Sequence, residues 1–317
     1  MKFLVTGAAG FIGSNVCKRL LSEGHEVVGV DNLDPYYDVE IKKARISDLI
    51  LDSPLFLFRQ NDISKGGLGR IAIETNGFDF IIHLAAQAGV RHSIANPMAY
   101  IHSNLVGFQH VIELARKTRP INFVYASSSS VYGGNTPPFD ESMSIQTPQS
   151  LYAATKVSNE MVAHSYGQMY GLESTGLRFH TVYGPNGRPD MLFRIAIEKI
   201  MKGKPIDLFW EDGAPMRRDF TYIDDIVDGI VEAAFKPEVN QVYNLAGGKC
   251  VDIEYALELI EECMGKQLER RYTGKQVGDI EQTASGLDKA KAGLGYAPKV
   301  GLEVGIRRMC EWHKAHP

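Results

Sequence analysis

The chain has 317 residues, 44% of them hydrophobic and 23% charged, the composition of a globular protein with one large domain or two modest ones. Its formal net charge of −4 and pI near 6.2 argue against a nucleic-acid-binding surface, so small-molecule partners are expected. The four cysteines form no CxxC pair, which excludes a recognisable disulfide framework or zinc site. No secretory signal and no run of ~20 apolar residues is found, so we expect a cytoplasmic protein without a membrane partner.

Apolar runs of strand length alternate with helix-period stretches through the first 180 residues. The strand runs are FLVTG, EVVGVDN, LFLFRQND, FDFIIHLAA, INFVYASS and ESTGLRF. This alternation predicts βαβ units and a parallel sheet buried on both faces. We predict an α/β fold, with a Rossmann-type doubly wound parallel sheet over 1–180 and a smaller α/β substrate-binding lobe over 181–317. The run QVYNLAGG, near 241–245, is expected to return a strand to the first sheet.

A glycine-rich turn follows the first strand and opens a helix in TGAAGFIG. Its glycines would let the backbone approach a pyrophosphate, whose charge the helix N-terminus offsets. Asp31 ends the second strand, where a carboxylate bonds the adenosine ribose and repels a 2′-phosphate, so NAD is favoured over NADP. Asp62 could equally meet the adenine or cap a helix. The expected cofactor-binding residues are Gly7, Gly10, Phe11, Ile12, Gly13, Asp31, Asn32, Asp62, Ile63, Leu84, Ala85, Ala86, Gln87, Asn104, Tyr152 and Lys156.

A tyrosine and a lysine lie four residues apart in SLYAATK, on one face of a predicted helix. The phenol of Tyr152 would titrate near pH 10 without help, and the ammonium of Lys156 favours its ionised form. Four serines end a strand upstream, in VYASSSSVYGG. A serine there could orient a substrate hydroxyl against the phenolate.

Taken together, these motifs resemble the extended short-chain dehydrogenase/reductase superfamily over essentially the whole chain. The segments that carry the resemblance are TGAAGFIG, HLAAQAG, YASSSSVYG, YAATK and RRDFTYIDDIVDGI. The resemblance implies that Ser128 is the catalytic hydroxyl, Tyr152 the acid/base and Lys156 its electrostatic partner.

Within the superfamily, the serine block separates the possible reactions. Nucleotide-sugar dehydratases usually carry Thr-Asp-Glu at the positions matching Ser128, Ser129 and Ser130, and UDP-glucuronate decarboxylases carry Glu at the last of them. NLDPYYDVEIKKARI, AGVRHSIANPMAYIHSNLVGF, FHTVYGPNGRPDM and MRRDFTYIDDIVDGI are most similar to UDP-glucuronate 4-epimerases. That resemblance implies conversion of UDP-glucuronate to UDP-galacturonate. Tyr152 would take the C4 hydroxyl proton and tightly bound NAD the hydride; the 4-keto sugar would then turn, and hydride would return to its other face.

The 4-keto intermediate is a β-keto acid that could lose CO2, so an epimerase must fix its carboxylate. By resemblance, Arg188 lies near that carboxylate, and its planar fork suits an oxyanion. Thr181 stands where neutral-sugar epimerases typically have Asn, Arg218 resembles a diphosphate-binding arginine, and Asp279 lies in a segment that contacts the nucleoside in relatives. The expected substrate-binding residues are Ser128, Ser129, Ser130, Thr181, Arg188, Arg218 and Asp279.

Three other functions stay open: neutral UDP-sugar 4-epimerisation, decarboxylation to UDP-xylose, and a non-catalytic NAD-binding regulator. His83 and His164 lack ligand partners at useful spacing, so we expect core or helix-surface positions and no metal. Two segments, MAYIHSNLVGFQHVIELARK and YAATKVSNEMVAHSYGQMY, could form the dimer contact usual in relatives, and a homodimer is expected. Two departures fall near the site, His180 where relatives often have Tyr and Asn186 where they often have Trp.

Overall fold

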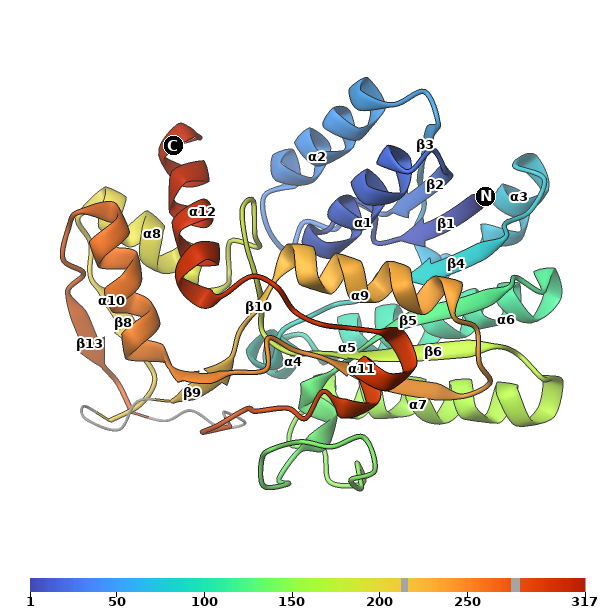
Figure 1. The fold of residues 1–317 in the computed structure, drawn as a ribbon. Coiled ribbons are helices and arrows are strands. Elements are labelled where there is room, and N and C mark those ends of the chain that lie inside the picture. Colours follow the sequence, from blue (N-terminus) through green and yellow to red (C-terminus); the bar gives the residue numbers. More distant parts are fainter. Residues whose placement is uncertain (212–215, 275–279, 317) are drawn as a thin grey trace.

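A computed structural model of the protein describes residues 1–211, 216–274 and 280–316. Its centre is a seven-stranded parallel sheet in the order β3-β2-β1-β4-β5-β6-β11. Figure 1 labels β1 to β6 of this sheet. The fold class is therefore as predicted. The strands are β1 (Lys2–Thr6), β2 (Glu26–Asp31), β3 (Phe56–Gln60), β4 (Phe80–His83), β5 (Asn122–Ser128), β6 (Ser174–Phe179) and β11 (Gln241–Leu245).

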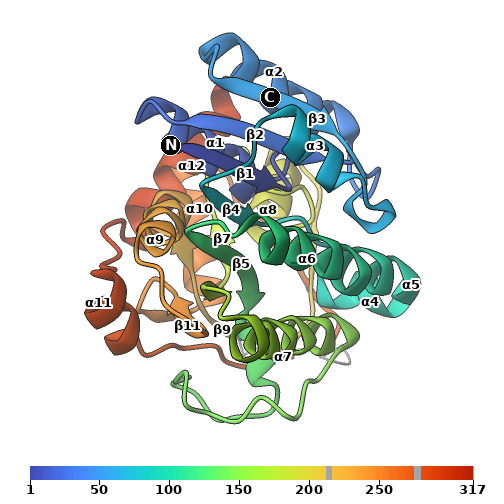
Figure 2. The same cartoon turned by 90° about the vertical axis from the view of Figure 1, so that its right-hand side faces the viewer.

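Helices cover both faces of this sheet (Figure 2). Neighbouring residues of one strand point to opposite faces: Phe3 packs in the core beside α1 and α9, and Leu4 packs in the core beside α6 and α7. Burial on both faces explains why the strand sequences barely alternate. The flanking helices are α1 (Phe11–Ser22), α2 (Val39–Asp52), α3 (Leu68–Glu74), α6 (Phe108–Thr118), α7 (Leu151–Tyr170) and α9 (Ile223–Phe235).

Short helices connect the strand ends on the side where ligands bind in such sheets. They are η1 (Ile63–Lys65), α4 (Val90–Ala95), α5 (Pro97–Tyr100), the π-helix η2 (Ile101–Gly107) and the 3-10 helix η3 (Ser129–Tyr132). The strand order reverses between β1 and β4, which both pair in parallel with their neighbours. A crevice at the carboxyl ends of the strands forms at such a reversal.

Among the described residues, the second lobe is built from three short strand pairs and three helices. β7 pairs in parallel with β10, β8 with β13, and β9 antiparallel with β12. Its elements are β7 (Val182–Tyr183), α8 (Leu192–Lys202), β8 (Ile206–Leu208), β9 (Arg217–Asp219), β10 (Thr221–Tyr222), β12 (Cys250–Asp252), α10 (Ile253–Met264), β13 (Arg270–Tyr272) and α12 (Leu302–Ala315).

The chain crosses between the lobes more than once. β11 pairs in parallel with β6, and α9 packs against α1, β5 and β6. α11 (Asp288–Leu294) packs against α9 and β11, so it also lies beside the first sheet. One apolar core runs from Phe3 in β1 to Met309 in α12, joining the lobes. Within the described residues, no helix combines the length and the apolar composition needed to cross a membrane.

Candidate active site

The turn after β1 is shaped by its three glycines. Gly7 has φ +73°, and a Cβ there would lie 2.7 Å from the backbone nitrogen of Ala85. A Cβ on Gly13 would lie 2.0 Å from the carbonyl oxygen of Gly7, which accepts the N–H of Gly10 at 2.9 Å. The turn therefore has no room for side chains at these positions. Its geometry fits a backbone cradle for a dinucleotide pyrophosphate at the start of α1.

Asp31 ends β2 next to this turn. Its two carboxylate oxygens accept the backbone N–H groups of Ala9 at 3.1 Å and Leu33 at 2.8 Å. Burial raises the pKa of Asp31, while these hydrogen bonds and the charge of Lys42 oppose that rise. Each oxygen keeps acceptor capacity, so the carboxylate can still bind the hydroxyls of a ribose.

The end of β4 completes the floor of the predicted cofactor site. The N–H groups of Leu84 and Ala85 bond to the backbone and hydroxyl oxygens of Thr6, which places Leu84–Gln87 against the glycine turn. Asn104, in η2, is buried and clamps the backbone of Gln87, accepting its N–H at 2.8 Å and donating to its carbonyl at 3.0 Å. The amide of Asn104 thus fixes the backbone of Gln87 at the predicted cofactor site.

Asp62 lies at the N-terminus of η1. Its Oδ1 accepts the N–H of Ser64 at 3.0 Å and the Ser64 hydroxyl at 2.7 Å, so it forms the helix cap that the sequence had allowed. The next residue, Ile63, is buried, and its carbonyl accepts a hydrogen bond from His110. A contact of either residue with an adenine stays a prediction.

Two of the expected catalytic groups meet between the end of β5 and the start of α7. Ser128 lies beside Tyr152 and lowers the pKa of its phenol, and the Ser128 hydroxyl donates to that of Ser130 at 3.1 Å. One hydroxyl proton can serve only one acceptor at a time. Burial raises the pKa of Tyr152, while the bond from Ser128 and the charge of Arg188 lower it. The phenol therefore has a hydrogen-bond donor and a cation beside it.

Lys156 lies one helical turn after Tyr152 and is 3% exposed. Its ammonium donates to the carbonyl of Ala126 at 2.8 Å. Burial lowers the pKa of Lys156 to about 8, and the carboxylate of Glu160 opposes that fall. The sequence predicts that this ammonium assists the phenolate, and that role stays a prediction. The cation whose charge lowers the pKa of Tyr152 is Arg188.

The four serines separate into different environments. Ser127 points beneath α7, where its hydroxyl donates to Glu160 at 2.5 Å, and Glu160 forms a buried ion pair with Arg178 at 2.7 Å. Ser129 and Ser130 open η3 and are partly exposed. The hydroxyls of the block therefore differ in their neighbours: Ser127 bonds to Glu160 of α7, and Ser128 lies beside Tyr152.

Arg188 follows β7 in a loop that faces the same strand ends. It lines one pocket together with Thr181 and Phe11. Thr181 also fixes the loop through its carbonyl, which accepts the N–H of Thr221 at 2.9 Å. Arg188 acts electrostatically on Tyr152, so the structure brings together the two groups expected at the sugar's C4 and carboxylate.

The remaining predicted substrate contacts lie apart from this group. Arg218 lies on β9 of the second lobe and donates to the carbonyls of Arg217 at 2.8 Å and Glu281 at 3.1 Å. Asp279 lies outside the residues that the structure describes. Roles for both in binding a nucleotide stay predictions.

Sequence reasoning missed three side chains that organise the site. Asp190 binds Arg188 through both carboxylate oxygens and accepts the Tyr36 hydroxyl at 2.9 Å. Arg45, buried in α2, donates to the carbonyl of Ala9 at 3.1 Å and to that of Asn186. Asn186, at φ +53°, is one of the two noted departures, and Arg45 ties its loop to the glycine turn. The only local sequence signal for Asp190 was its place two residues after Arg188, in the segment RPD.

The two histidines considered as ligands lie in ordinary positions. His83 is buried at the end of β4, and its Nδ1 is 2.7 Å from the hydroxyl of Thr6. Burial lowers the pKa of His83 to about 3, so the ring is neutral at physiological pH. His164 is exposed on α7. In the described ranges there is no group of three side chains suited to hold a metal.

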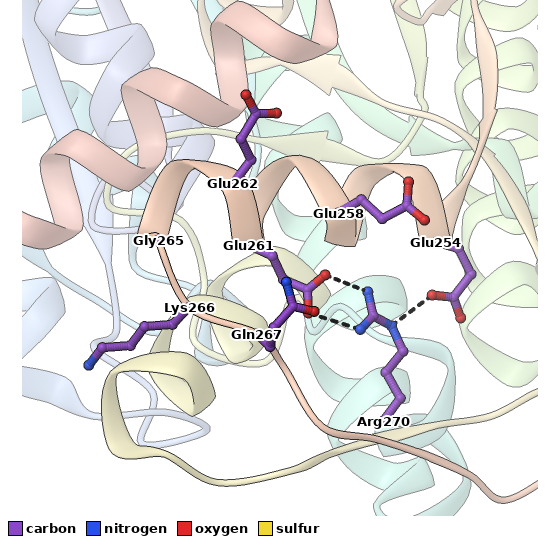
Figure 3. Close-up of a pocket in the computed structure, with 8 residues that line it drawn as sticks. All are labelled: Glu254, Glu258, Glu261, Glu262, Gly265, Lys266, Gln267 and Arg270. Atoms are coloured by element: carbon purple, nitrogen blue, oxygen red, sulfur yellow. Dashed lines mark hydrogen bonds and ion pairs between the residues drawn. The ribbon is translucent and has the colours of Figure 1, made fainter.

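A second depression lies along α10, as Figure 3 shows, and is lined by acidic side chains including Glu258 and Glu262. Arg270 crosses it, donating to Glu261 at 2.9 Å and to Glu254 at 2.8 Å. None of the predicted site residues lines this depression. Its lining has four glutamates and two cations, Lys266 and Arg270, and so keeps an excess of negative charge.

Comparison with known proteins agrees with this geometry. Residues 3–246 match the NAD dependent epimerase/dehydratase family, and the chain belongs to it. It is 43% identical to an uncharacterised protein of Methanocaldococcus jannaschii (98% of this chain, 95% of the relative) and 42% identical to a UDP-glucuronate 4-epimerase of Thermodesulfobacterium geofontis (98% and 96%). Among solved structures, a UDP-glucuronic acid 4-epimerase from Bacillus cereus, in complex with UDP-glucuronic acid and NAD, superposes with a TM-score of 0.93 at 33% identity, covering all of both chains.

Proposed function

We propose that this protein interconverts UDP-glucuronate and UDP-galacturonate by inverting C4, with NAD held in the cradle formed by Gly7, Gly10, Gly13 and Asp31. Bound NAD supplies the hydride acceptor and donor at C4 and is regenerated in each cycle. The side chains then have distinct tasks. Tyr152 takes the C4 hydroxyl proton and later returns it, and Ser128 orients the C4 oxygen. Lys156, one helical turn further along α7, is assigned the role of favouring the ionised phenol through its positive charge.

One observation carries this proposal. Ser128, which is hydrogen-bonded to Ser130, and the cation Arg188 both lower the pKa of the Tyr152 phenol, and residues 127–130 include no carboxylate. Elimination of water needs an additional acid and base, which hydroxyls at Ser129 and Ser130 do not supply. A substrate carboxylate would meet hydrogen-bond donors here, together with a guanidinium whose charge Asp190 partly offsets. The arrangement therefore suits an acidic sugar that keeps its carboxylate.

Retention of the carboxylate is the demanding step, because the 4-keto intermediate is a β-keto acid. Arg188 and Thr181 line one pocket, and with Ser130 at the start of η3 they are the proposed ligands of the carboxylate. We propose that they hold it in an orientation that disfavours cleavage of its bond to the ring. Arg218 and Asp279 are proposed to bind the nucleotide.

A neutral UDP-sugar is a second candidate substrate, and a specific observation favours it. Arg188 already forms a bidentate ion pair with Asp190, so its charge is partly neutralised before any sugar arrives. A site of this kind can accept UDP-glucose with little penalty from an unpaired cation. Incubation with UDP-glucose and UDP-glucuronate in parallel decides between the two substrates.

We also propose that the protein is a cytoplasmic homodimer. All four cysteines are free thiols, which supports a reducing compartment. Met161, Met169 and Tyr170 on α7 are large apolar side chains that face solvent, which supports a helical interface. Size-exclusion chromatography with light scattering tests the dimer: a mass near 35 kDa, that of one chain, would contradict it.

The experiment that tests the proposed function is direct. Purified protein is incubated with UDP-glucuronate, and products are followed by NMR together with CO2 release. We expect UDP-galacturonate without CO2. A dominant pentose product would make the protein a decarboxylase. NAD binding with no interconversion of any nucleotide sugar would make it a regulator.

A further inference from the structure

The bidentate edge of Arg188 is occupied by a residue of its own loop. Nε donates to Oδ1 of Asp190 at 3.0 Å, and Nη2 donates to Oδ2 at 2.5 Å. The hydroxyl of Tyr36, from the loop after β2, donates to the same Oδ2 at 2.9 Å. Burial opposes the charge of Asp190, but the hydrogen bond and charge of Arg188 and the bond from Tyr36 prevail and lower its pKa. Asp190 is therefore a carboxylate at neutral pH.

The guanidinium also lies near Gly89 and Tyr152. Nη2 lies 3.8 Å from the position that a Cβ on Gly89 would take, and Gly89 has no side chain to fill that space. The same cation lowers the pKa of Tyr152. An arriving sugar carboxylate can thus meet Arg188 only at its remaining N–H groups, because the paired edge is taken.

We propose that Asp190 is a specificity-determining residue that limits how tightly Arg188 binds the sugar carboxylate. It does so by holding the bidentate edge and by cancelling part of the positive charge. This inference rests on the proposed function, in which the keto sugar must turn between the loss and the return of hydride. A sugar carboxylate bound by an unpaired, fully charged guanidinium would dissociate from it slowly, and kcat would fall.

The proposal predicts opposite effects on binding and on turnover. In Asp190→Asn, the side chain keeps its shape but loses its charge, so UDP-glucuronate should bind more tightly relative to UDP-glucose. We expect the ratio of the two dissociation constants to shift toward UDP-glucuronate by about tenfold, the lower range measured for close charge pairs at interfaces. Both KM and kcat for UDP-glucuronate should fall. If Asp190 only kept Arg188 in place, Asp190→Asn would raise KM for UDP-glucuronate instead.

The test measures dissociation constants of UDP-glucuronate and UDP-glucose by calorimetry on NAD-loaded protein. If Asp190 acts through Arg188, the shift seen in Asp190→Asn must vanish when the same change is made in the Arg188→Ala background. Asp228→Asn is the matched control: Asp228 pairs with Arg19 on α1 and is 31% exposed, against 32% for Asp190. It should leave the ratio unchanged.

The proposal would be overturned if Asp190→Asn left the preference for UDP-glucuronate over UDP-glucose unchanged or reduced it. An equal shift of this preference in the Arg188→Ala background would also overturn it. Asp190→Ala removes the carboxylate outright and should shift the ratio in the same direction, so the proposal can be tested even if the Asn variant folds poorly. Calorimetry does not depend on turnover. A protein that shows the binding shift yet converts no UDP-glucuronate would therefore contradict the proposed reaction and leave the role of Asp190 standing.

Discussion

Ser128, the last residue of β5, lies beside Tyr152 in the first turn of α7 and lowers the pKa of its phenol. The register of the sheet produces this contact, because Ser128 pairs with Phe179 at the carboxyl end of β5 and α7 passes beside that end. Burial raises the pKa of Tyr152, so the chain alone leaves the phenol protonated at neutral pH. Its work as a base then depends on Ser128, on nearby cations and on the charge of the bound cofactor.

Removing the hydroxyl of Ser128 should slow the chemical step. In Ser128→Ala the C4 oxygen loses its orienting partner, and we expect kcat for UDP-glucuronate to fall by about 10²-fold with a small change in KM. Steady-state kinetics measure this. Ser129→Ala serves as control and should have the smaller effect; equal losses in both variants would remove Ser128 from its assigned role.

A methyl group at Gly13 should abolish cofactor binding. The new Cβ would lie 2.0 Å from the carbonyl oxygen of Gly7, so the turn must open. We expect Gly13→Ala to lose at least 10²-fold in NAD affinity, because the cradle depends on close backbone approach. Fluorescence titration with NADH measures it. Gly69→Ala, in α3 with open space around it, is the control, and a bound cofactor of normal affinity in Gly13→Ala would refute the assignment.

Truncating Arg188 should impair turnover of the substrate without weakening binding of the cofactor. Arg188→Ala removes the cation beside Tyr152 and the proposed carboxylate contact, so turnover of UDP-glucuronate should fall by 10²-fold or more while NAD affinity stays within about twofold. Arg19→Ala removes the matched arginine of the Arg19–Asp228 pair and should keep wild-type kinetics. Unchanged kinetics in Arg188→Ala would place the arginine outside the site.

Acid should destabilise the fold through its buried histidines. Burial lowers the pKa of His180 to about 3, so the ring is neutral in the folded protein but takes a proton in the unfolded chain below pH 6.5. Its contribution is present above pH 6.5 and is lost as the pH falls toward 3. Among the described residues, both ring nitrogens of His180 lack a hydrogen-bond partner, so nothing within them compensates for protonation.

Urea unfolding across this range tests the effect. Replacing His180 by Phe should reduce the fall of the unfolding free energy between pH 6 and pH 4 by up to about 1.4 kcal/mol per pH unit, the effect of one proton. His83 and His313, whose pKa values burial also lowers, keep part of the slope in this variant. His164→Gln, on the surface of α7, should leave the slope as it is in the wild type.

The sheet and the cofactor turn could be predicted because local sequence determines them. Gly7, Gly10 and Gly13 lie within seven residues, and the turn they form is made by neighbouring backbone atoms. The same holds for Tyr152 and Lys156, which one helical turn brings together. Even the return of β11 to the sheet followed from an apolar run of strand length.

The supports of the site could not be predicted because they join distant segments. Tyr36 reaches Asp190 across the two lobes, and Arg45 links Ala9 to Asn186. No spacing rule connects such positions, since only the folded chain brings them together. The bond from the Lys156 ammonium to the carbonyl of Ala126 is another such link, and the help of Lys156 to the phenol stays a prediction.

The central claim is that C4 is inverted while the carboxylate stays on the sugar. The most direct measurement is NMR of the nucleotide products, with CO2 monitored, after incubation of the purified protein with UDP-glucuronate. Starting from either epimer, the account predicts the same mixture of UDP-glucuronate and UDP-galacturonate, with no CO2. Accumulation of UDP-xylose with one CO2 per sugar would contradict it.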